Sequence, residues 1–456
     1  MVSPDRQLGD LPSSKEAYST LFRLALPSVA EMLLTSLIGM VDTVMVSNLG
    51  EAAIAAVGLT TQPRMLVMAV FLALNAGLTA VVARRKGEER RDDANKSLSG
   101  MVTVILLLAI LLASLAVTFA NPIMRFAGAV EGETLEIGMI YYRILIAAAP
   151  LNAVTMAINA AQRGIGKTKI TMYVNMTANI VNVIFNFLLI EGRFGFPRLE
   201  IAGAAIASVI GIIVGFIMCI LSITVHKGFL RLSLRDMLRP SKEALAPVIK
   251  VGGNAVIEQV AMRIGFFTFA KIVAGLGTDN MAAHQIILQF TTISYTVGDG
   301  IGVAGTSLVG QNLGRKRPDI SLVYGKVSQR VAVVAGCILC ATFILARYPL
   351  IAMFSDKPAV VEAAAPAMIV AALSLLLQTS AVVISGCLRG SGDTRYVAYI
   401  MIVAIAILRP IFSVLTVLVF NWGLIGAWTA MASEITVRLI LLYIRFASFK
   451  WAKIKV

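Results

Sequence analysis

The sequence has few charged residues, few histidines and few cysteines, and each scarcity excludes a class of protein. Only 14% of the 456 residues are charged, which is too few for a soluble chain of this length. The two histidines, His226 and His284, exclude a histidine-rich metal site, and the four cysteines lie in or beside apolar stretches. A disulfide framework and a structural zinc site are therefore not expected. Residues 1–17 are polar and lack the short apolar run of a signal peptide.

The abundant apolar residues gather into long stretches. Hydrophobic residues make up 58% of the chain. A membrane-spanning helix needs roughly 20 consecutive, mostly apolar residues, and twelve stretches reach that length. We therefore predict an all-α integral membrane protein with twelve transmembrane helices, at residues 20–46, 53–83, 97–120, 137–162, 168–190, 201–226, 247–274, 282–310, 320–346, 360–387, 396–420 and 425–446.

The two halves of the chain repeat each other. Shifting the sequence by 227 positions (258 − 31) places Glu31 on Glu258 without a gap. Other identical pairs are Val46 and Val273, Gly50 and Gly277, Gln62 and Gln289, Thr79 and Thr306, and Gly87 and Gly314. A second block, residues 163–169, matches residues 389–395. Six helices per repeat return the chain to its starting side, so the repeats are parallel, and such duplication is typical of secondary transporters.

Charged loops orient and divide the chain. Most Lys and Arg residues lie in alternate loops, and the positive-inside rule assigns those loops and both termini to the cytoplasmic side. The net charge of +15 therefore indicates topology rather than nucleic-acid binding. The loop between the repeats alternates Leu or Met with Arg, which predicts a short amphipathic helix on the inner leaflet. The predicted parts are a tail at residues 1–18, a six-helix lobe at 19–226, a linker at 227–246, a second six-helix lobe at 247–446 and a tail at 447–456.

Four polar residues of the first repeat are predicted to form a cage. An ionisable side chain at hydrocarbon depth costs at least a few kcal/mol, so Asp42 in the first helix is a functional candidate. Asn182 and Asn186 share one face of the fifth helix at the depth of Asp42, and Ser208 of the sixth helix lies at a similar level. Such a cage can hold a proton or a cation. The alternative is a hydrogen-bonded network that packs the helices together and has no role in transport. The second repeat has Phe269 at the place of Asp42.

Other buried ionisable residues are candidates for a substrate cavity. Glu31 and Glu258 occupy equivalent places in the two repeats. Their carboxylates either line the cavity, or make a polar contact between the lobes, or snorkel toward water. Arg409 precedes Pro410, where a helix break is expected, and a structural role is equally open for it. The arginines in this group are Arg64, Arg263 and Arg409.

Several motifs resemble the recurrent patterns of one transporter family, in the same order along essentially the whole chain. They are Leu21-Phe-Arg-Leu-Ala-Leu-Pro27, Val41-Asp42-Thr43, Ala52-Ala-Ile-Ala-Ala-Val-Gly58, Val82-Ala-Arg-Arg-Lys-Gly87, Ala282-Ala-His-Gln-Ile286, Gly310-Gln-Asn-Leu-Gly314 and Leu388-Arg-Gly-Ser-Gly-Asp-Thr394. On these motifs the chain is similar to the multidrug and toxic compound extrusion (MATE) family of antiporters, within the multidrug/oligosaccharidyl-lipid/polysaccharide superfamily.

The resemblance implies two six-helix bundles forming a V, and alternating access to a central cavity. It also implies export of bulky, lipophilic and often cationic compounds in exchange for protons or Na⁺. Asp42 matches the functional acid of the family's first helix, and Asn182 matches the asparagine beside it. Ser208 stands where a threonine is usual, and Asn186 where one branch has a second aspartate. The Na⁺-linked branch has acids at the places of Met262 and Gln378, so the resemblance favours proton coupling, as in the DNA-damage-inducible branch. On the same alignment, Met262 and Gln378 are further candidates for the substrate cavity.

Three other functions fit the sequence less well than efflux does. A lipid-linked oligosaccharide flippase of the same superfamily usually has a strongly cationic cavity, whereas Glu31, Glu258 and Asp42 oppose the arginines here. A membrane enzyme needs an acid/base or metal constellation that the chain does not offer, and two repeats cannot build a channel's ring of acids. We therefore predict a non-enzymatic multidrug efflux antiporter of the plasma (bacterial inner) membrane, expected to be a monomer. Its expected partners are drugs or toxic metabolites, the lipid bilayer and a coupling ion, H⁺ or Na⁺, with no cofactor, resident metal or nucleic acid.

Overall fold

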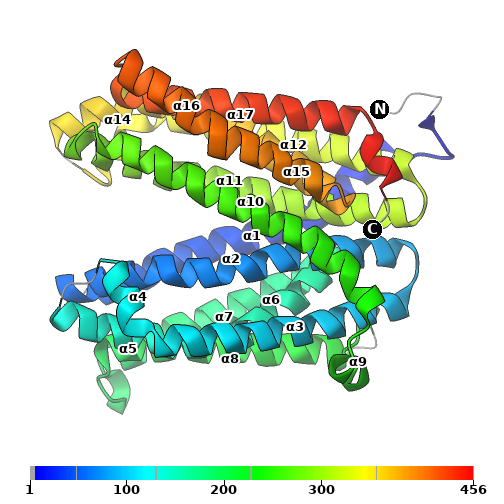
Figure 1. Cartoon of the computed structure of the whole chain (residues 1–456), viewed down its shortest axis with the longest axis horizontal. Helices are drawn as coiled ribbons and strands as arrows, with labels where there is room; N and C mark the ends of the chain where they lie inside the picture. The colour runs from blue at the N-terminus through cyan, green and yellow to red at the C-terminus, as the bar shows by residue number, and fades with distance from the viewer. Residues whose placement is uncertain (1–5, 48, 129–130, 226–227, 356, 455–456) are drawn as a thin grey trace. The chain divides into compact units, whose positions relative to one another are not determined.

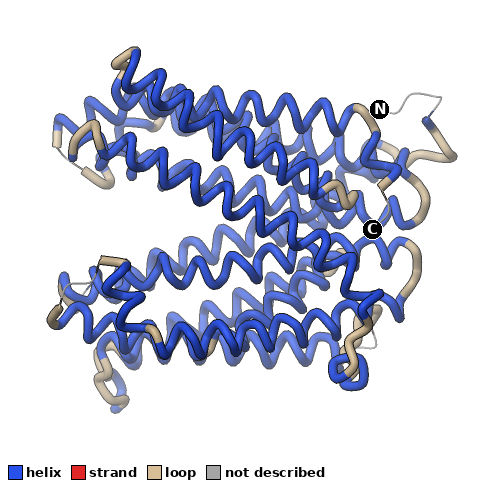
Figure 2. Tube along the Cα trace, in the orientation of Figure 1, coloured by secondary structure: helices blue, strands red, loops and turns tan. Residues whose placement is uncertain are grey.

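The computed structural model describes residues 6–47, 49–128, 131–225, 228–355 and 357–454, and these ranges contain helices and no strand (Figures 1 and 2). The helices of the first half are α1 (Ser14–Ser47), α2 (Glu51–Gly87), α3 (Arg91–Thr118), α4 (Ala120–Phe126), α5 (Glu133–Ala147), α6 (Ala149–Gly164), α7 (Thr168–Leu189), η2 (Arg193–Gly195), α8 (Glu200–Thr224) and α9 (Leu234–Leu238). Those of the second half are α10 (Lys242–Ala274), α11 (Thr278–Gly314), α12 (Pro318–Leu345), α13 (Arg347–Ala352), α14 (Pro358–Gly390), α15 (Thr394–Met401), η3 (Ile402–Leu408), α16 (Arg409–Ser413), η4 (Val414–Val419), α17 (Gly423–Ala447) and η5 (Lys450–Lys453).

Each of the twelve predicted stretches coincides with a helix or a run of consecutive helices. Within the described ranges, nine helical segments are long and apolar enough to cross a membrane, and the bent pair α5–α6 makes a tenth. The other two stretches form the long helices α10 and α11, in which charged residues such as Glu258 and Asp299 lower the apolar character. The predicted all-α membrane architecture is confirmed.

The chain divides into two compact units, and the division falls inside two helices. Unit 1 comprises Met1–Val29 and Gly253–Val456, and unit 2 comprises Ala30–Gly252. The first part of α1 thus belongs to unit 1 and the first part of α10 to unit 2. The lobes expected from the sequence begin at residues 19 and 247, which also lie inside α1 and α10 but before the observed points of division. The expected boundary between residues 226 and 227, and the tail ends at 1–5 and 455–456, lie outside the described residues.

The N-terminal tail of unit 1 contacts the beginning of α12. The backbone N–H of Leu8 donates to Asp319 at 3.1 Å, and Arg317 donates to the carbonyl of Asp10 at 2.8 Å. Three apolar residues of α1, namely Ala17, Leu21 and Ala25, lie in the unit 1 core. The tail and the start of α1 are therefore integral to this unit.

Glycines allow close helix contacts at equivalent places in both units. In unit 1, α14 packs against α11, α12 and α17, and a Cβ on Gly390 would lie 2.3 Å from the carbonyl oxygen of Thr306. In unit 2, α2 packs against α5 and α6, and a Cβ on Gly164 would lie 2.7 Å from the carbonyl oxygen of Thr79. The duplication has thus kept the same threonine–glycine contact in each half.

The linker lies on α3 in unit 2. Ser97 donates to the carbonyl of Ala244 at 2.8 Å, and Thr103 donates to the carbonyl of Met237 at 2.9 Å. The short helix α9 exposes Leu234 by 77% and Leu238 by 83%. An amphipathic helix on a membrane surface presents such apolar residues to the lipid.

Proline shapes two of the predicted spans. Helices α5 and α6 meet at an angle of 45°, next to Pro150, because proline donates no hydrogen bond and its ring clashes with the preceding turn. The helix break expected at Pro410 does not occur, since residues Thr394–Val419 form one helical segment. Instead the π-helical segments η3 and η4 flank α16, and these wider turns accommodate the proline.

Candidate functional site

The four predicted cage residues lie together in unit 2. Asp42 comes from α1, Asn182 and Asn186 from α7, and Ser208 from α8. Asn186 Nδ2 donates to Asp42 Oδ1 at 2.8 Å. The exposed fractions of Asn182 and Asn186 are 6% and 1%, so the carboxylate lies against a buried amide pair.

The orientation of the Asn182 amide follows from its neighbours. With its nitrogen turned toward Asp42, Asn182 donates to both carboxylate oxygens at 2.9 Å, and its oxygen accepts from Ser208 Oγ at 3.0 Å and Ser208 N at 3.1 Å. The opposite orientation would direct the amide oxygen at the carboxylate. Asn186 Oδ1 has no hydrogen-bond partner among the described residues. This oxygen can therefore accept a hydrogen bond from a proton donor, or it can ligate a cation.

A small cavity adjoins the cage. Its volume is about 150 Å³, and it is lined by Met45, Asn186, Phe187, Ile190, Glu191 and Arg193. Arg193 Nε donates to Glu191 Oε2 at 2.7 Å, so the end of the cavity beyond α7 carries a charged pair. Because Asn186 belongs to both the cavity and the cage, the cavity leads to the direct partner of Asp42.

Glu31 lies in unit 2 with an arginine of the same unit. Its side chain is 5% exposed and accepts hydrogen bonds from Arg163 Nη2 at 2.7 Å, Thr171 Oγ1 at 2.8 Å and Asn175 Nδ2 at 2.5 Å. A buried carboxylate is tolerated when an ion pair and further donors satisfy it, as they do here.

The repeat-related acid in unit 1 has an equivalent partner. Glu258 is 4% exposed and accepts from Arg389 Nη2 at 2.6 Å. Arg163 and Arg389 occupy matching places in the second repeated block. We predicted both acids for the substrate cavity, and the structure pairs each of them within its own unit.

Gln378 and Arg409, two further cavity candidates, are buried in a polar network of unit 1. Glu434 Oε2 accepts from Arg409 Nη2 at 2.7 Å, and its other oxygen lies 3.2 Å from Arg438 Nε. Arg438 Nη2 donates to Gln378 Oε1 at 2.6 Å. All four residues are at most 2% exposed. Two guanidinium groups share one carboxylate here, so this network disfavours binding of Na⁺ at Gln378.

The remaining candidates have separate surroundings. Met262 packs against the apolar core of unit 1, and Arg263 is exposed on α10. Arg64 of α2 lies within electrostatic range of Tyr141 and of Asp42. Arg64 therefore belongs to the surroundings of the cage.

The arginine partners of the two acids were not predicted, although the sequence contains a signal for them. Glu31 and Glu258 are repeated in one block, and Arg163 and Arg389 are repeated in the other. Opposite charges that recur together in both halves are candidates for an ion pair. Their pairing depends on helix packing, which sequence spacing alone does not give.

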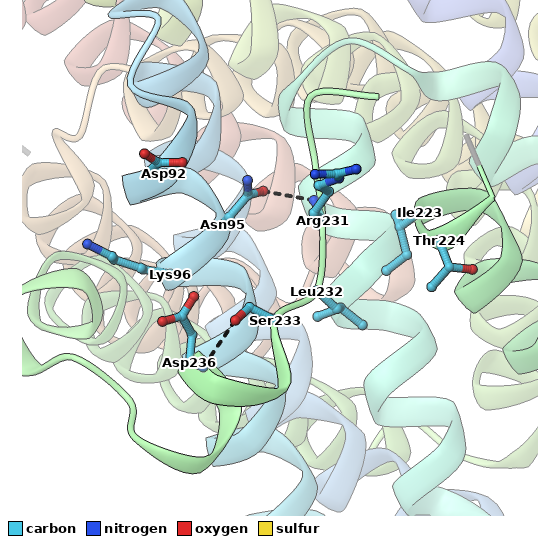
Figure 3. A pocket seen from close by; sticks show the side chains of 9 residues that line it. All are labelled: Asp92, Asn95, Lys96, Ile223, Thr224, Arg231, Leu232, Ser233 and Asp236. Atoms are coloured by element: carbon cyan, nitrogen blue, oxygen red, sulfur yellow. Dashed lines mark hydrogen bonds between the residues drawn. The ribbon is translucent and has the colours of Figure 1, made fainter. Parts of the chain in front are cut away.

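A second hollow lies where the linker meets α3 and α8 (Figure 3). Its volume is about 580 Å³, and its charged lining residues are Asp92, Lys96, Arg231 and Asp236. Asn95 accepts from the backbone N–H of Arg231 at 2.8 Å, and Ser233 accepts from that of Asp236 at 3.3 Å. These bonds fix the linker, and the hollow shares no lining residue with the cage.

Comparison with known proteins identifies relatives of the whole chain. The model of the MatE family matches residues 27–188 and 255–415, one range in each repeat. The chain is 28% identical over 444 residues to "Probable multidrug resistance protein NorM" of Thermotoga maritima, covering 96% of this chain and 94% of the relative. It is 26% identical over 381 residues to "Multidrug resistance protein PmpM" of Pseudomonas aeruginosa, covering 82% and 79%.

Solved structures share the fold at lower identity. The chain matches "Outward-facing conformation of a multidrug resistance MATE family transporter of the MOP superfamily" with a TM-score of 0.88 and 21% identity, covering 95% of this chain and 97% of that one. A MOP superfamily transporter from Pyrococcus furiosus, described as having a binding pocket of reverse polarity, matches with the same TM-score, identity and coverage. These likenesses show the fold alone.

Proposed function

Because the chain belongs to the MatE family, we propose that it is a secondary active antiporter that exports bulky, lipophilic and often cationic compounds by alternating access. Relatives named as multidrug resistance proteins match it over most of its length. Their names support efflux over the oligosaccharide flippase alternative. The parallel repeats support alternating access, since paired repeats are the usual framework of such transporters.

We further propose that the coupling ion is a proton and that Asp42 carries it. The observation behind this is the contact of its carboxylate with Asn182 and Asn186. The protonated acid is neutral and tolerated at hydrocarbon depth, and the ionised acid is stabilised by the two amide donors. A coupling site needs both forms to be accessible. The matching position in unit 1 is Phe269, which is 1% exposed, so the cage is specific to unit 2.

The proposed orientation follows from the basic loops. We propose that the protein lies in the bacterial inner membrane with both termini in the cytoplasm, because Lys and Arg concentrate in alternate loops. The cavity beside Asn186 then opens toward the outside and the block at residues 163–169 toward the cytoplasm. Protons would enter at the cavity and leave near that block, as the inward proton gradient requires.

Efflux from reconstituted vesicles tests the coupling proposal. A pH gradient and a Na⁺ gradient are imposed separately, and export of a lipophilic cation is followed for the wild type, Asp42→Asn and Ser208→Ala. Asp42→Asn keeps the volume of the side chain but cannot cycle a proton, so we expect pH-driven export to fall to the background of empty vesicles. Ser208→Ala leaves the carboxylate intact and is expected to keep most of the export. Wild-type export by a well-expressed Asp42→Asn protein would rule out a coupling role for Asp42.

A further inference from the structure

Unit 2 contains a row of polar contacts that extends beyond the cage. Three residues of α1 each contact the α7 residue 144 positions later in the chain. The pairs are Glu31 with Asn175 at 2.5 Å, Thr35 with Asn179 at 3.2 Å, and Asp42 with Asn186 at 2.8 Å. The constant separation means that α1 and α7 run parallel and in register. We name these three pairs the polar ladder.

The asparagines of α7 form one continuous stripe. Asn175, Asn179, Asn182 and Asn186 are spaced by four, three and four residues, which keeps them on one helix face. At 1.5 Å per residue the stripe spans about 16 Å, roughly half of the ~30 Å hydrocarbon core. Helix packing in membranes needs small residues and occasional polar contacts. A stripe of four amides facing two carboxylates exceeds that need.

Each end of the polar ladder reaches polar surroundings. At one end, Asn186 lines the cavity that also contains Glu191. At the other end, Glu31 is paired with Arg163, whose side chain is 23% exposed and which lies in the last turn of α6. The ladder therefore connects an open cavity with a partly exposed loop end along the contact between α1 and α7.

The middle of the polar ladder has room for water. Thr35 is exposed, although its hydroxyl contacts Asn179. Gly39 lies between Thr35 and Asp42 near the same face of α1, and a Cβ built on it would contact nothing within 4 Å. The longest interval between rungs on α1, from Thr35 to Asp42, thus includes one position without a side chain, Gly39.

The second repeat keeps the acid–arginine pair and lacks the rest of the ladder. Glu258 and Arg389 reproduce Glu31 and Arg163 at offsets of 227 (258 − 31) and 226 (389 − 163). At those offsets the other ladder residues are replaced by apolar side chains: Thr35 by Met262, Asp42 by Phe269, Asn175 by Met401, Asn179 by Ile405 and Asn186 by Phe412. A Cβ on Gly265 would lie 2.3 Å from the carbonyl oxygen of Ile405, so the corresponding helices also touch in unit 1. The ion pair and the helix contact therefore do not require the ladder.

We propose that the polar ladder conducts the coupling proton and that Glu31 is its second proton site. This rests on the proposed proton coupling at Asp42. In the first step the proton leaves the Asp42 carboxyl group and passes along water held by Thr35 and Asn179 to a carboxylate oxygen of Glu31. Asp42 becomes a carboxylate and Glu31 a neutral acid. In the second step Glu31 releases the proton to water beside Arg163, and the ion pair forms again.

The test compares Glu31→Gln with its repeat-matched control Glu258→Gln. Each substitution removes the negative charge from an acid–arginine pair, but only Glu31 belongs to the polar ladder. In proteoliposomes we would measure tetraphenylphosphonium export driven by a pH gradient, and exchange of labelled tetraphenylphosphonium at equal concentrations without a gradient. Exchange requires only the substrate-loaded transporter to reorient, whereas driven export also requires proton release. We expect the ratio of driven export to exchange to collapse in Glu31→Gln and to match the wild type in Glu258→Gln.

Two results would overturn the proposal. One is a wild-type ratio in Glu31→Gln, and the other is an equal loss of the ratio in both glutamine variants, which would indicate a structural role of the ion pairs. If Glu31→Gln fails to fold, Asn179→Leu is the variant that tests the proposal, because it removes the Thr35–Asn179 contact and leaves the Glu31–Arg163 ion pair intact. This variant is expected to lower the ratio, and a wild-type ratio would contradict the ladder.

The same measurements separate the ladder from the coupling proposal. If Asp42→Asn retains driven export, or if only a Na⁺ gradient drives the wild type, then the coupling assignment fails and the ladder falls with it. If Asp42→Asn is inactive and Glu31→Gln behaves as the wild type, the coupling site stands and only the ladder is refuted.

Discussion

Glu434 contacts two arginines in the interior of unit 1, and the three side chains are expected to stabilise the fold only as a complete set. Removing one partner of a buried ion pair costs about 3–5 kcal/mol, because it leaves an uncompensated charge. Glu434→Gln should therefore lower the free energy of unfolding by about that amount, since Arg409 and Arg438 would remain without an anion. Thermal and denaturant unfolding in detergent would measure the loss.

The double variant Glu434→Gln/Arg409→Met is the control for this prediction. It removes one positive charge together with the carboxylate, and Arg438 keeps its bond to Gln378. It should recover part of the lost stability, since the two residues are in direct contact and their effects are not additive. Wild-type unfolding of Glu434→Gln would show that the network is not important for stability.

A second carboxylate in the cage should change the pH dependence of transport. Asn186→Asp places two acids near each other beside Asn182, and like charges in a small site resist joint ionisation. The pair should therefore hold its first proton at higher pH than Asp42 alone. We expect the pH at half-maximal export to rise, measured as efflux rate against external pH. An unchanged pH profile would argue against proton binding in the cage.

The sequence was informative about the cage and less so about the acids outside it. Asp42, Asn182, Asn186 and Ser208 could be grouped by helical spacing and depth, because each lies in an apolar helix and the order of the spans gives the directions of these helices relative to one another. The surroundings of Glu31 could not be derived in this way. Its arginine partner lies at the end of another helix, and only the packing of α6 against its neighbours brings the two together.

At the scale of helices, the contact between α11 and α14 depends on a missing side chain. A Cβ on Gly390 would lie 2.3 Å from the carbonyl oxygen of Thr306. The hydroxyl of Thr306 donates a hydrogen bond to the carbonyl oxygen of Gly386 at 2.8 Å. Overpacking of this kind typically costs about 1–3 kcal/mol. Gly390→Ala is thus expected to lower the unfolding temperature. Gly253→Ala in α10 is the control, since a Cβ there meets nothing within 4 Å; equal stability of the two variants would contradict the prediction.

Helix positions could be predicted because apolar length is a local property. The bend between α5 and α6 and the π-helical turns around Pro410 were not predicted, although both prolines are visible in the sequence. A proline marks where a helix is under strain, but neighbouring helices decide whether it bends, breaks or widens. The apolar run therefore gives the extent of a span and leaves its shape open.

At the scale of the whole molecule, labelling tests the proposed orientation. Glu89→Cys, at a side chain exposed in the loop between α2 and α3, should react with an impermeant thiol reagent only after the cells are opened. Phe194→Cys, at a side chain 85% exposed between α7 and α8, should react in intact cells. The exposed native Cys337 must first be replaced by serine. Labelling of the Glu89→Cys protein from outside intact cells would contradict the proposed topology.

The boundaries of the compact units could not be predicted from the sequence. Loops and charge patterns indicate where helices end, and they suggested that the division follows the linker. The structure divides instead at Val29 and Gly252, inside apolar helices that carry no local signal of a boundary. Which part of a long helix belongs to which core depends on distant packing partners.

Helices α1 and α10 each divide their length between the two units, and this division constrains how the nascent chain can fold. Residues 14–29 leave the ribosome before the second half of the chain, yet Leu21 packs with Leu308 and Leu388 from that half. Unit 2 in turn needs the start of α10, where a Cβ on Gly77 would lie 2.5 Å from the carbonyl oxygen of Val248. The first half thus cannot complete its core before translation has passed the linker. Two separately synthesised halves, cut at that linker, would each lack a segment of their own interior and are expected to be substrates for quality-control proteases unless both are made together.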